Sequence, residues 1–539
     1  MLHACLIALF ASILLSRQAA ASLGQALPPL LTLSLAIALP LGWLGVLFAA
    51  SWRADRHIGR TGSLRSLRTL DRLTALATLT CTFGLCAATL MGGWLTIVRS
   101  VTGDLIVVDE ALAVSPLLVL TIGTWALSYP IQRRLREAVI FRQVEQGLPV
   151  HPIPTRAGFV SQQTRHQLLL LLVPMGLLWT ISESLDRGVD RLVALARRAQ
   201  VGEPLSTTLT LGADLGRWLA TSGYGPGLLL TLHVGAALVV VACAPAIIRR
   251  LWRTTPLTRA HNATRAPSTG SDLLYDLPVE PPLSEDLLAL AREQRVGVAQ
   301  VLIWQTGGTT LNGAVLGVLG RFRYILLTDA LLERLPRPMV LAVMAHELAH
   351  VKLRHIPWLA ATLFAASSLP LIAAQGVGLL VGVRFEQLGP EFQLLSGVAS
   401  VACAIAAFGF VSRRFEWQAD AFAVRALSQR EQARGALTVV GLLDSITGGG
   451  APGAGTLTLS VSASSAMAGA LLAVASANGT DPRRFGFRHG SIAHRVARIK
   501  ALPGTALDAV PIDRAASRLK FSVAVACIAS IAALVLTEI

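Results

Sequence analysis

The sequence predicts a mainly α-helical, polytopic membrane protein in which a soluble α+β domain is interrupted by a transmembrane hairpin. Of its 539 residues, 53% are hydrophobic and only 14% are charged, and the mean hydropathy is +0.59. Several apolar runs approach or exceed the roughly 20 residues that a helix needs to cross a bilayer. These observations place the chain in the multi-span membrane class.

Nine apolar runs are candidate transmembrane helices. They are Leu2 to Leu15, Leu27 to Ala50, Leu73 to Val98, Ala111 to Tyr129, Leu168 to Ile181, Gly227 to Ile248, Trp358 to Val383, Phe392 to Val411 and Phe521 to Leu536. The first and fifth are short for a span, so we expect about nine spans in total. The first could instead be a cleaved signal sequence ahead of "RQAAAS", but it lacks the usual basic start, and a retained anchor is favoured.

The formal net charge of +16 indicates membrane topology rather than a surface for nucleic acid. Almost all of the basic residues are Arg, and many lie in short loops beside apolar runs. Basic loops of membrane proteins are retained in the cytoplasm. We therefore expect the lipid bilayer as a partner and no nucleic acid.

Loop charges predict the orientation of the chain. The segments Ser51 to Arg72 and Ile131 to His166 are rich in Arg and should be cytoplasmic, whereas the acidic loop around Asp109 belongs on the far side. Alternation then places the N-terminus inside, and it places the soluble segments Arg249 to Ile356 and Ser412 to Lys520 together in the cytoplasm. We expect a multi-pass protein of a bacterial inner membrane with its active site on the cytoplasmic side.

Five parts are expected along the chain. They are an N-terminal transmembrane region of about six spans (1–248), a cytoplasmic linker and first soluble part (249–356), a transmembrane hairpin (357–411), a second soluble part (412–520) and a C-terminal transmembrane helix (521–539). In the soluble parts, "TTPLTRAHNATRAPSTGSD" is typical of a polar linker and "TGGGAPGAGT" of a flexible loop. "AQVLIWQTG" predicts a strand, and "YILLTDALLERL" predicts a strand that runs into a helix.

The stretch "VMAHELAHVKLRH", which ends at His355, contains His-Glu-x-x-His. Residues four apart share one face of a helix, so His346 and His350 could bring two imidazole nitrogens to one zinc ion, with Glu347 placed to accept a proton from a water on the metal. The alternative is an amphipathic helix whose polar stripe matches by coincidence. His355 would lie about 140° round the same helix from His350 and is expected to mark the membrane boundary instead.

A second motif, in "SRRFEWQADAFAVRAL", offers the third ligand that a hydrolytic zinc site needs. Here Glu-x-x-Ala-Asp stands at the start of a predicted helix, on the same side of the membrane as the first motif. Glu416 could bind the metal, and Asp420 could orient a ligand His from behind. The alternative is a solvated acidic stripe paired with Arg413, Arg414 or Arg425, which would require both motifs to coincide by chance.

The order "HELAHVKLRH", membrane hairpin, "RRFEWQAD" resembles the membrane metalloproteases that include the CaaX prenyl endopeptidase and the HtpX-type heat-shock proteases. The resemblance covers roughly Gln300 to Leu502. It implies one zinc ion per chain, bound by His346, His350 and Glu416. It implies that Glu347 is the general base.

The family also has an Asn-Ala step on a strand that borders the substrate cleft. In this chain "LNGAVLG" places Asn312 and Ala314 in the corresponding region, with Gly313 inserted between them. The resemblance therefore implies a substrate-binding role for Asn312 and Ala314.

A late His-Pro segment with an Arg six residues on, which stabilises the oxyanion, is another family feature. "RHGSIAHRVARIKAL" offers His489 and Arg495 at this spacing, although Gly490 replaces the Pro, and His494 with Arg498 are competing choices. A donor near the scissile carbonyl is chemically sensible. A plain basic helix is the alternative.

These features predict a zinc endopeptidase that cleaves peptide bonds of peptide or protein substrates, membrane-associated ones included, at or near the cytoplasmic face. Membrane protein quality control and peptide processing are both compatible roles. One alternative is a metalloprotease-type signal transducer, but such proteins commonly carry Cys at Ala419 and Asp at His355, and no sensor-sized domain follows Phe521 to Leu536. The other is an inactive scaffold or transporter, although few charges fall inside the predicted spans.

Overall fold

In the computed structural model, residues 2–538 are described except for 24–25, 64, 104, 106, 146, 148–149, 202–205, 223–224, 258–280, 318–319, 383–389 and 448–456. Most of the expected polar linker and nearly all of the Gly-rich loop lie outside the described residues. The chain divides into two compact units, Met1–Trp252 and Arg253–Ile539.

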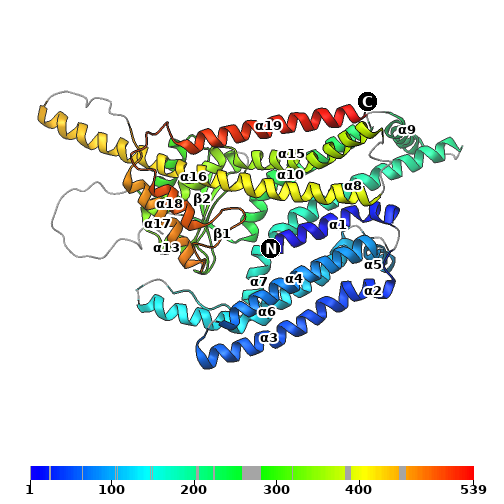
Figure 1. The fold of residues 1–539 in the computed structure, drawn as a ribbon, viewed down its shortest axis with the longest axis horizontal. Coiled ribbons are helices and arrows are strands. Elements are labelled where there is room, and N and C mark those ends of the chain that lie inside the picture. The colour runs from blue at the N-terminus through cyan, green and yellow to red at the C-terminus, as the bar shows by residue number, and fades with distance from the viewer. Residues whose placement is uncertain are drawn as a thin grey trace. The chain divides into compact units, whose positions relative to one another are not determined.

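The described part of the first unit is helical. Its elements are α1 (Leu2–Leu23), α2 (Pro29–Leu33), η1 (Ser34–Ala38), α3 (Leu39–Thr61), α4 (Arg65–Met91), α5 (Trp94–Thr102), α6 (Val108–Glu145), α7 (Arg156–Gln163), η2 (Thr164–Leu168), α8 (Leu169–Gln200), α9 (Thr207–Thr221) and α10 (Gly225–Leu251). Helix α4 packs against α1, α3 and α6 (Figure 1), and Leu85 and Leu117 lie fully buried among these helices. Helix α3 ends where Gly62 adopts φ 65°, a left-handed conformation that glycine adopts without strain.

Eight helical stretches among the described residues are long and apolar enough to cross a membrane. They are Pro29–Thr61, Arg65–Met91, Val108–Glu145, Arg156–Gln200, Gly227–Leu251, His355–Gly378, Leu395–Arg434 and Pro511–Ala533. Each coincides with a run predicted from the sequence, and the predicted polytopic fold is confirmed. The short fifth run lies inside a much longer helical stretch, whereas the first run lies in α1, which is not among the eight.

The described part of the second unit contains one sheet of four strands in the order β1-β2-β4-β3. The strands are β1 (Thr254–Pro256), β2 (Gln300–Trp304), β3 (Gly313–Leu316) and β4 (Tyr324–Thr328). Strands β2 and β4 pair in parallel, and β1 and β3 flank them antiparallel. The central strands are buried along nearly their whole length, which explains their continuous apolar sequences. Both sequence-predicted strands are present, and β3 forms one edge of the sheet.

The remaining elements of this unit are α12 (Leu283–Glu293), η3 (Gly320–Phe322), α13 (Asp329–Arg334), α14 (Arg337–Lys352), α15 (His355–Val381), α16 (Pro390–Thr447), α17 (Val461–Ala477), α18 (Ile492–Lys500) and α19 (Pro511–Glu538). Helix α14 packs against β3, α16 and α17, and α15, α16 and α19 run side by side (Figure 1). The apolar core of the unit centres on α14, where Ala345, Leu348 and Ala349 are fully buried.

Two helix boundaries differ from expectation. The acidic motif does not open a new helix: α16 is a single helix of 58 residues that continues from the membrane hairpin through Glu416, because neither Gly nor Pro interrupts the chain from Phe410 to Arg434. Conversely, α14 stops at Lys352, and Arg354 adopts the left-handed φ of 56° before α15 begins at His355. The stretch "HELAHVKLRH" is therefore not one continuous helix.

Candidate metal centre

Two helices bring three potential metal ligands together. Helix α14 carries His346 and His350 one turn apart, and their Nε2 atoms lie 3.3 Å from each other. Glu416 on α16 places Oε2 3.5 Å from Nε2 of His346 and Oε1 3.8 Å from Nε2 of His350. Ligand atoms of these three residues all lie within 4.8 Å of one another, and the group could hold a metal ion.

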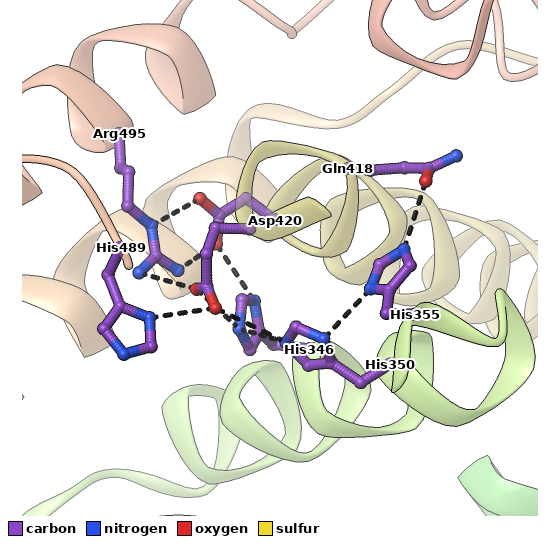
Figure 2. Close-up of polar contacts among 8 residues, drawn as sticks. His346, His350, His355, Gln418, Asp420, His489 and Arg495 are labelled. Atoms are coloured by element: carbon purple, nitrogen blue, oxygen red, sulfur yellow. Dashed lines mark hydrogen bonds and ion pairs between the residues drawn. The ribbon is translucent and has the colours of Figure 1, made fainter. Parts of the chain in front are cut away.

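The residues fit a zinc ion in spacing and in chemistry. Two ligand atoms at about 2.0 to 2.1 Å from a tetrahedral zinc lie about 3.3 Å apart, which the separation of the two Nε2 atoms matches. Nδ1 of His346 lies 3.0 Å from Oδ1 of Asp420 (Figure 2). When Nδ1 of His346 carries a proton, it can donate a hydrogen bond to Asp420. The lone pair on Nε2 then faces the other two potential ligands and is available to a metal.

The three ligands lie beside a cavity of about 590 Å3. Glu347, between the two histidines in sequence, lines the same cavity, as do Asn312 next to the edge strand β3 and Met467 and Leu471 from α17. The potential metal ligands, a further carboxylate and residues of the edge strand β3 thus line one cavity.

Comparison with known proteins supports this assignment. Residues 283–502 match the family model described as peptidase family M48. Over these residues the chain is similar to the M48 peptidases. The membrane metalloprotease resemblance is thereby confirmed, and the matched region begins earlier than expected because it includes α12.

A solved structure titled "Crystal Structure of S. mikatae Ste24p" is also similar, at 14% sequence identity and a TM-score of 0.33, with 87% of this chain and 98% of that chain covered. No curated protein matches.

The structure places His489 and Arg495 of the M48 region at the centre (Figure 2). Nδ1 of His489 lies 2.9 Å from Oε1 of Glu416, and 54% of the His489 side chain is exposed. Arg495 is buried and donates to both oxygens of Asp420, from Nε at 2.8 Å and Nη2 at 2.6 Å, while Nη1 lies 3.1 Å from Oε2 of Glu416. Arg495 therefore contacts both the potential ligand Glu416 and the carboxylate of Asp420 behind His346. The guanidinium of the competing Arg498 lies 4.5 Å from the ring centroid of Trp417 instead.

Asn312 and Ala314 lie at and just before the edge strand. Asn312 lines the cavity next to β3, whereas Ala314 pairs within the sheet with Leu326 of β4 and is not among the residues that line the cavity. The inserted Gly313 has a structural reason, because a Cβ at that position would lie 2.9 Å from the side chain of Val343 on α14. Glycine thus lets the edge strand approach the metal-binding helix closely.

His355 and Gln418 were not predicted to take part in the site. His355 is fully buried, its Nδ1 lies 2.9 Å from Nδ1 of His350, and its Nε2 lies 3.1 Å from Oε1 of Gln418 (Figure 2). His355 does not join the metal group, as expected, but the left-handed turn at Arg354 returns its ring to His350. The sequence prediction assumed one continuous helix through Arg354, and it therefore did not place His355 against His350.

Burial and charge set the protonation of the metal-free site. Burial disfavours charge on His346, but hydrogen bonds and charges of Asp420 and Glu416 overcome it and raise the pKa of His346 to about 10. Burial raises the pKa of Glu347 to about 7. Burial, together with the positive charge of His346, lowers the pKa of His350 to about 4. At neutral pH a proton on His346 therefore supplies the positive charge that a metal would supply when bound.

Proposed function

We propose that this protein is a zinc-dependent endopeptidase of the membrane that cleaves peptide bonds at or near the cytoplasmic face. The observation that carries the proposal is the convergence of His346, His350 and Glu416, with nitrogen and oxygen atoms 3.3 to 3.8 Å apart, beside a cavity that also contains Glu347. Two His and one Glu are a ligand set of hydrolytic zinc enzymes.

Each residue has a distinct task in the proposed reaction. Zinc, held by His346, His350 and Glu416, would supply a Lewis acid for the scissile carbonyl. Glu347 accepts the proton of the attacking water and passes it to the leaving amine, a task that suits a carboxylate with a pKa of about 7. His489, exposed at the cavity, is the donor available to the negative charge that develops on the carbonyl oxygen.

Arg495 takes a different role from the one that the family resemblance implied. Its guanidinium is already engaged by Asp420 and Glu416, so we assign it to holding the third ligand and the carboxylate behind His346. We assign His489, which is 54% exposed at the cavity, to the developing negative charge instead.

The cavity suits an extended peptide. Strand β3 is a sheet edge, and a peptide that pairs with such an edge gains main-chain hydrogen bonds that do not depend on its sequence. Helix α17 lines the cavity with Met467, Leu471 and Val474, which favours an apolar substrate side chain beside this helix. The Arg-rich loops favour a cytoplasmic location for this site, and we propose a role at a bacterial inner membrane in membrane protein quality control or in peptide processing.

Glu347→Gln tests the proposal. The variant should retain zinc, because the ligands are unchanged, but it should lose about 100- to 10,000-fold of its rate, because the proton acceptor is gone. Zinc content is measured by elemental analysis of detergent-purified protein, and cleavage by mass spectrometry of an unstructured reporter protein. Glu137→Gln, which alters a partly exposed carboxylate on α6, is the matched control.

Cleavage by Glu347→Gln at the control rate would refute the proposal. A wild-type protein that binds no zinc after incubation with the ion would favour the inactive scaffold instead.

A further inference from the structure

A chain of hydrogen bonds leads from the metal ligand His350 to the C-terminal helix α19. We infer that His355 sets which nitrogen of His350 faces the metal, and that Gln418 and Asp513 hold His355 in the required form, so that the C-terminal membrane helix completes the metal centre. The inference rests on the proposed metal site but not on the identity of the substrate. His355 is a positioning residue in this scheme.

The chain begins at Asp513, in the first turn of α19. Its carboxylate can only accept hydrogen bonds when ionised, and it accepts from Nη2 of Arg425 and from Nε2 of Gln418, the latter at 2.9 Å. The amide of Gln418 is thereby oriented: its nitrogen faces Asp513, so its Oε1 faces His355.

The second step sets the tautomer of His355. Oε1 of Gln418 is an acceptor, so Nε2 of His355, at 3.1 Å, must donate to it. The ring is fully buried and stacks on Phe415, with ring centroids 4.4 Å apart and an interplanar angle of 5°. A neutral imidazole that carries its proton on Nε2 presents a lone pair at Nδ1.

The third step reaches the metal ligand. Nδ1 of His355 lies 2.9 Å from Nδ1 of His350, and since the first is an acceptor, the second must carry the proton. His350 then presents its Nε2 lone pair toward Nε2 of His346 and the carboxylate of Glu416. Without an acceptor at this point, His350 could carry its proton on Nε2 instead, the atom that would bind the metal.

A second contact ties α19 to the same place. Nζ of Lys520 donates to the carbonyl oxygen of Leu353 at 2.8 Å, and Leu353 is the C-cap residue of the metal-binding helix α14. Helix α19 thus contacts the end of α14 directly and reaches His355, the side chain that orients His350, through Gln418. Its role extends beyond that of a membrane anchor.

Two substitutions at His355 separate hydrogen bonding from packing. His355→Phe keeps the ring that stacks on Phe415 but removes the acceptor, whereas His355→Asn loses the ring but keeps an acceptor oxygen close to the position of Nδ1. We expect His355→Phe to weaken zinc affinity by about 10- to 100-fold and His355→Asn by much less, because the loss of a residue that orients a ligand His typically costs this much. Affinity is measured on the full-length protein in detergent by competition with a chelator.

A purely packing role of His355 predicts the reverse order. An affinity for the Phe variant equal to or tighter than that of the Asn variant would therefore overturn the inference.

Gln418→Met provides an independent test. It should weaken zinc binding in the wild-type background but have little further effect in the His355→Phe background, because Gln418 acts only through His355. An undiminished effect in both backgrounds would refute the relay. Because the readout is metal binding without substrate, absence of peptide cleavage in every protein, wild type included, would count against the proposed function alone.

Discussion

Zinc binding should compete with a proton at His346, and the competition should be visible as a pH-dependent affinity. Asp420 and Glu416 raise the pKa of His346 to about 10, and a metal can use Nε2 only after its proton has left. A metal thus binds to a minor form of the site at neutral pH.

The size of the effect on zinc affinity follows from the difference between the pH and the pKa of His346. At pH 7 the pKa of about 10 leaves roughly one site in a thousand deprotonated, a cost of about 4 kcal/mol at about 1.36 kcal/mol per unit. The sign is set by mass action: raising the pH removes the competing proton, so zinc affinity should rise about tenfold per pH unit up to pH ~10. Glu347, with a pKa of about 7, would add to the proton release.

The assay should therefore use Glu347→Gln, in which His346 is the main source of the released proton. Zinc affinity is measured by chelator competition between pH 6 and 8, and proton release by calorimetry in buffers of different ionisation enthalpy. Asp420→Asn removes the negative charge beside Nδ1 of His346, so zinc affinity should depend less steeply on pH in this variant. An affinity that does not change across this range, with no proton released, would refute the assigned protonation of the site.

Two further predictions concern residues around the centre. Arg495→Met should lower the free energy of unfolding by about 3 to 5 kcal/mol, because it removes the buried guanidinium that pairs with both Asp420 and Glu416; an unchanged thermal unfolding temperature in detergent would contradict this. Asn478 exchanges two hydrogen bonds with the backbone of Leu311, at 3.0 and 3.1 Å, just before the edge strand. Asn478→Ala should raise KM for the reporter about 5- to 30-fold, since each bond contributes about 1 kcal/mol, with little change in kcat.

The membrane spans were predictable because each span is encoded by one continuous stretch of the sequence. A span needs about 20 apolar residues in a row, and eight of the nine predicted runs correspond to helices of sufficient length. The pairing of His346 with His350 was equally local, because helix geometry alone brings residues four apart to one side.

The rest depended on where helices stop and on contacts between distant residues. His355 was misplaced because the projection assumed a continuous helix, whereas Arg354 turns the chain by adopting a left-handed conformation that carries no strong sequence signal in a non-glycine residue. The ion pairs of Arg495 with Asp420 join positions 75 residues apart, which no periodicity encodes. The motif suggested that both residues belong to the site, but not that they bind each other.

The continuity of α16 has a consequence for proteolytic release of the metal centre. Leu395–Arg434 is a candidate membrane span, and Glu416 lies within the same unbroken helix. A cut in α16 on the N-terminal side of Glu416 would separate this potential ligand from the membrane-spanning part of the same helix. A soluble fragment released by such a cut should therefore lose metal binding.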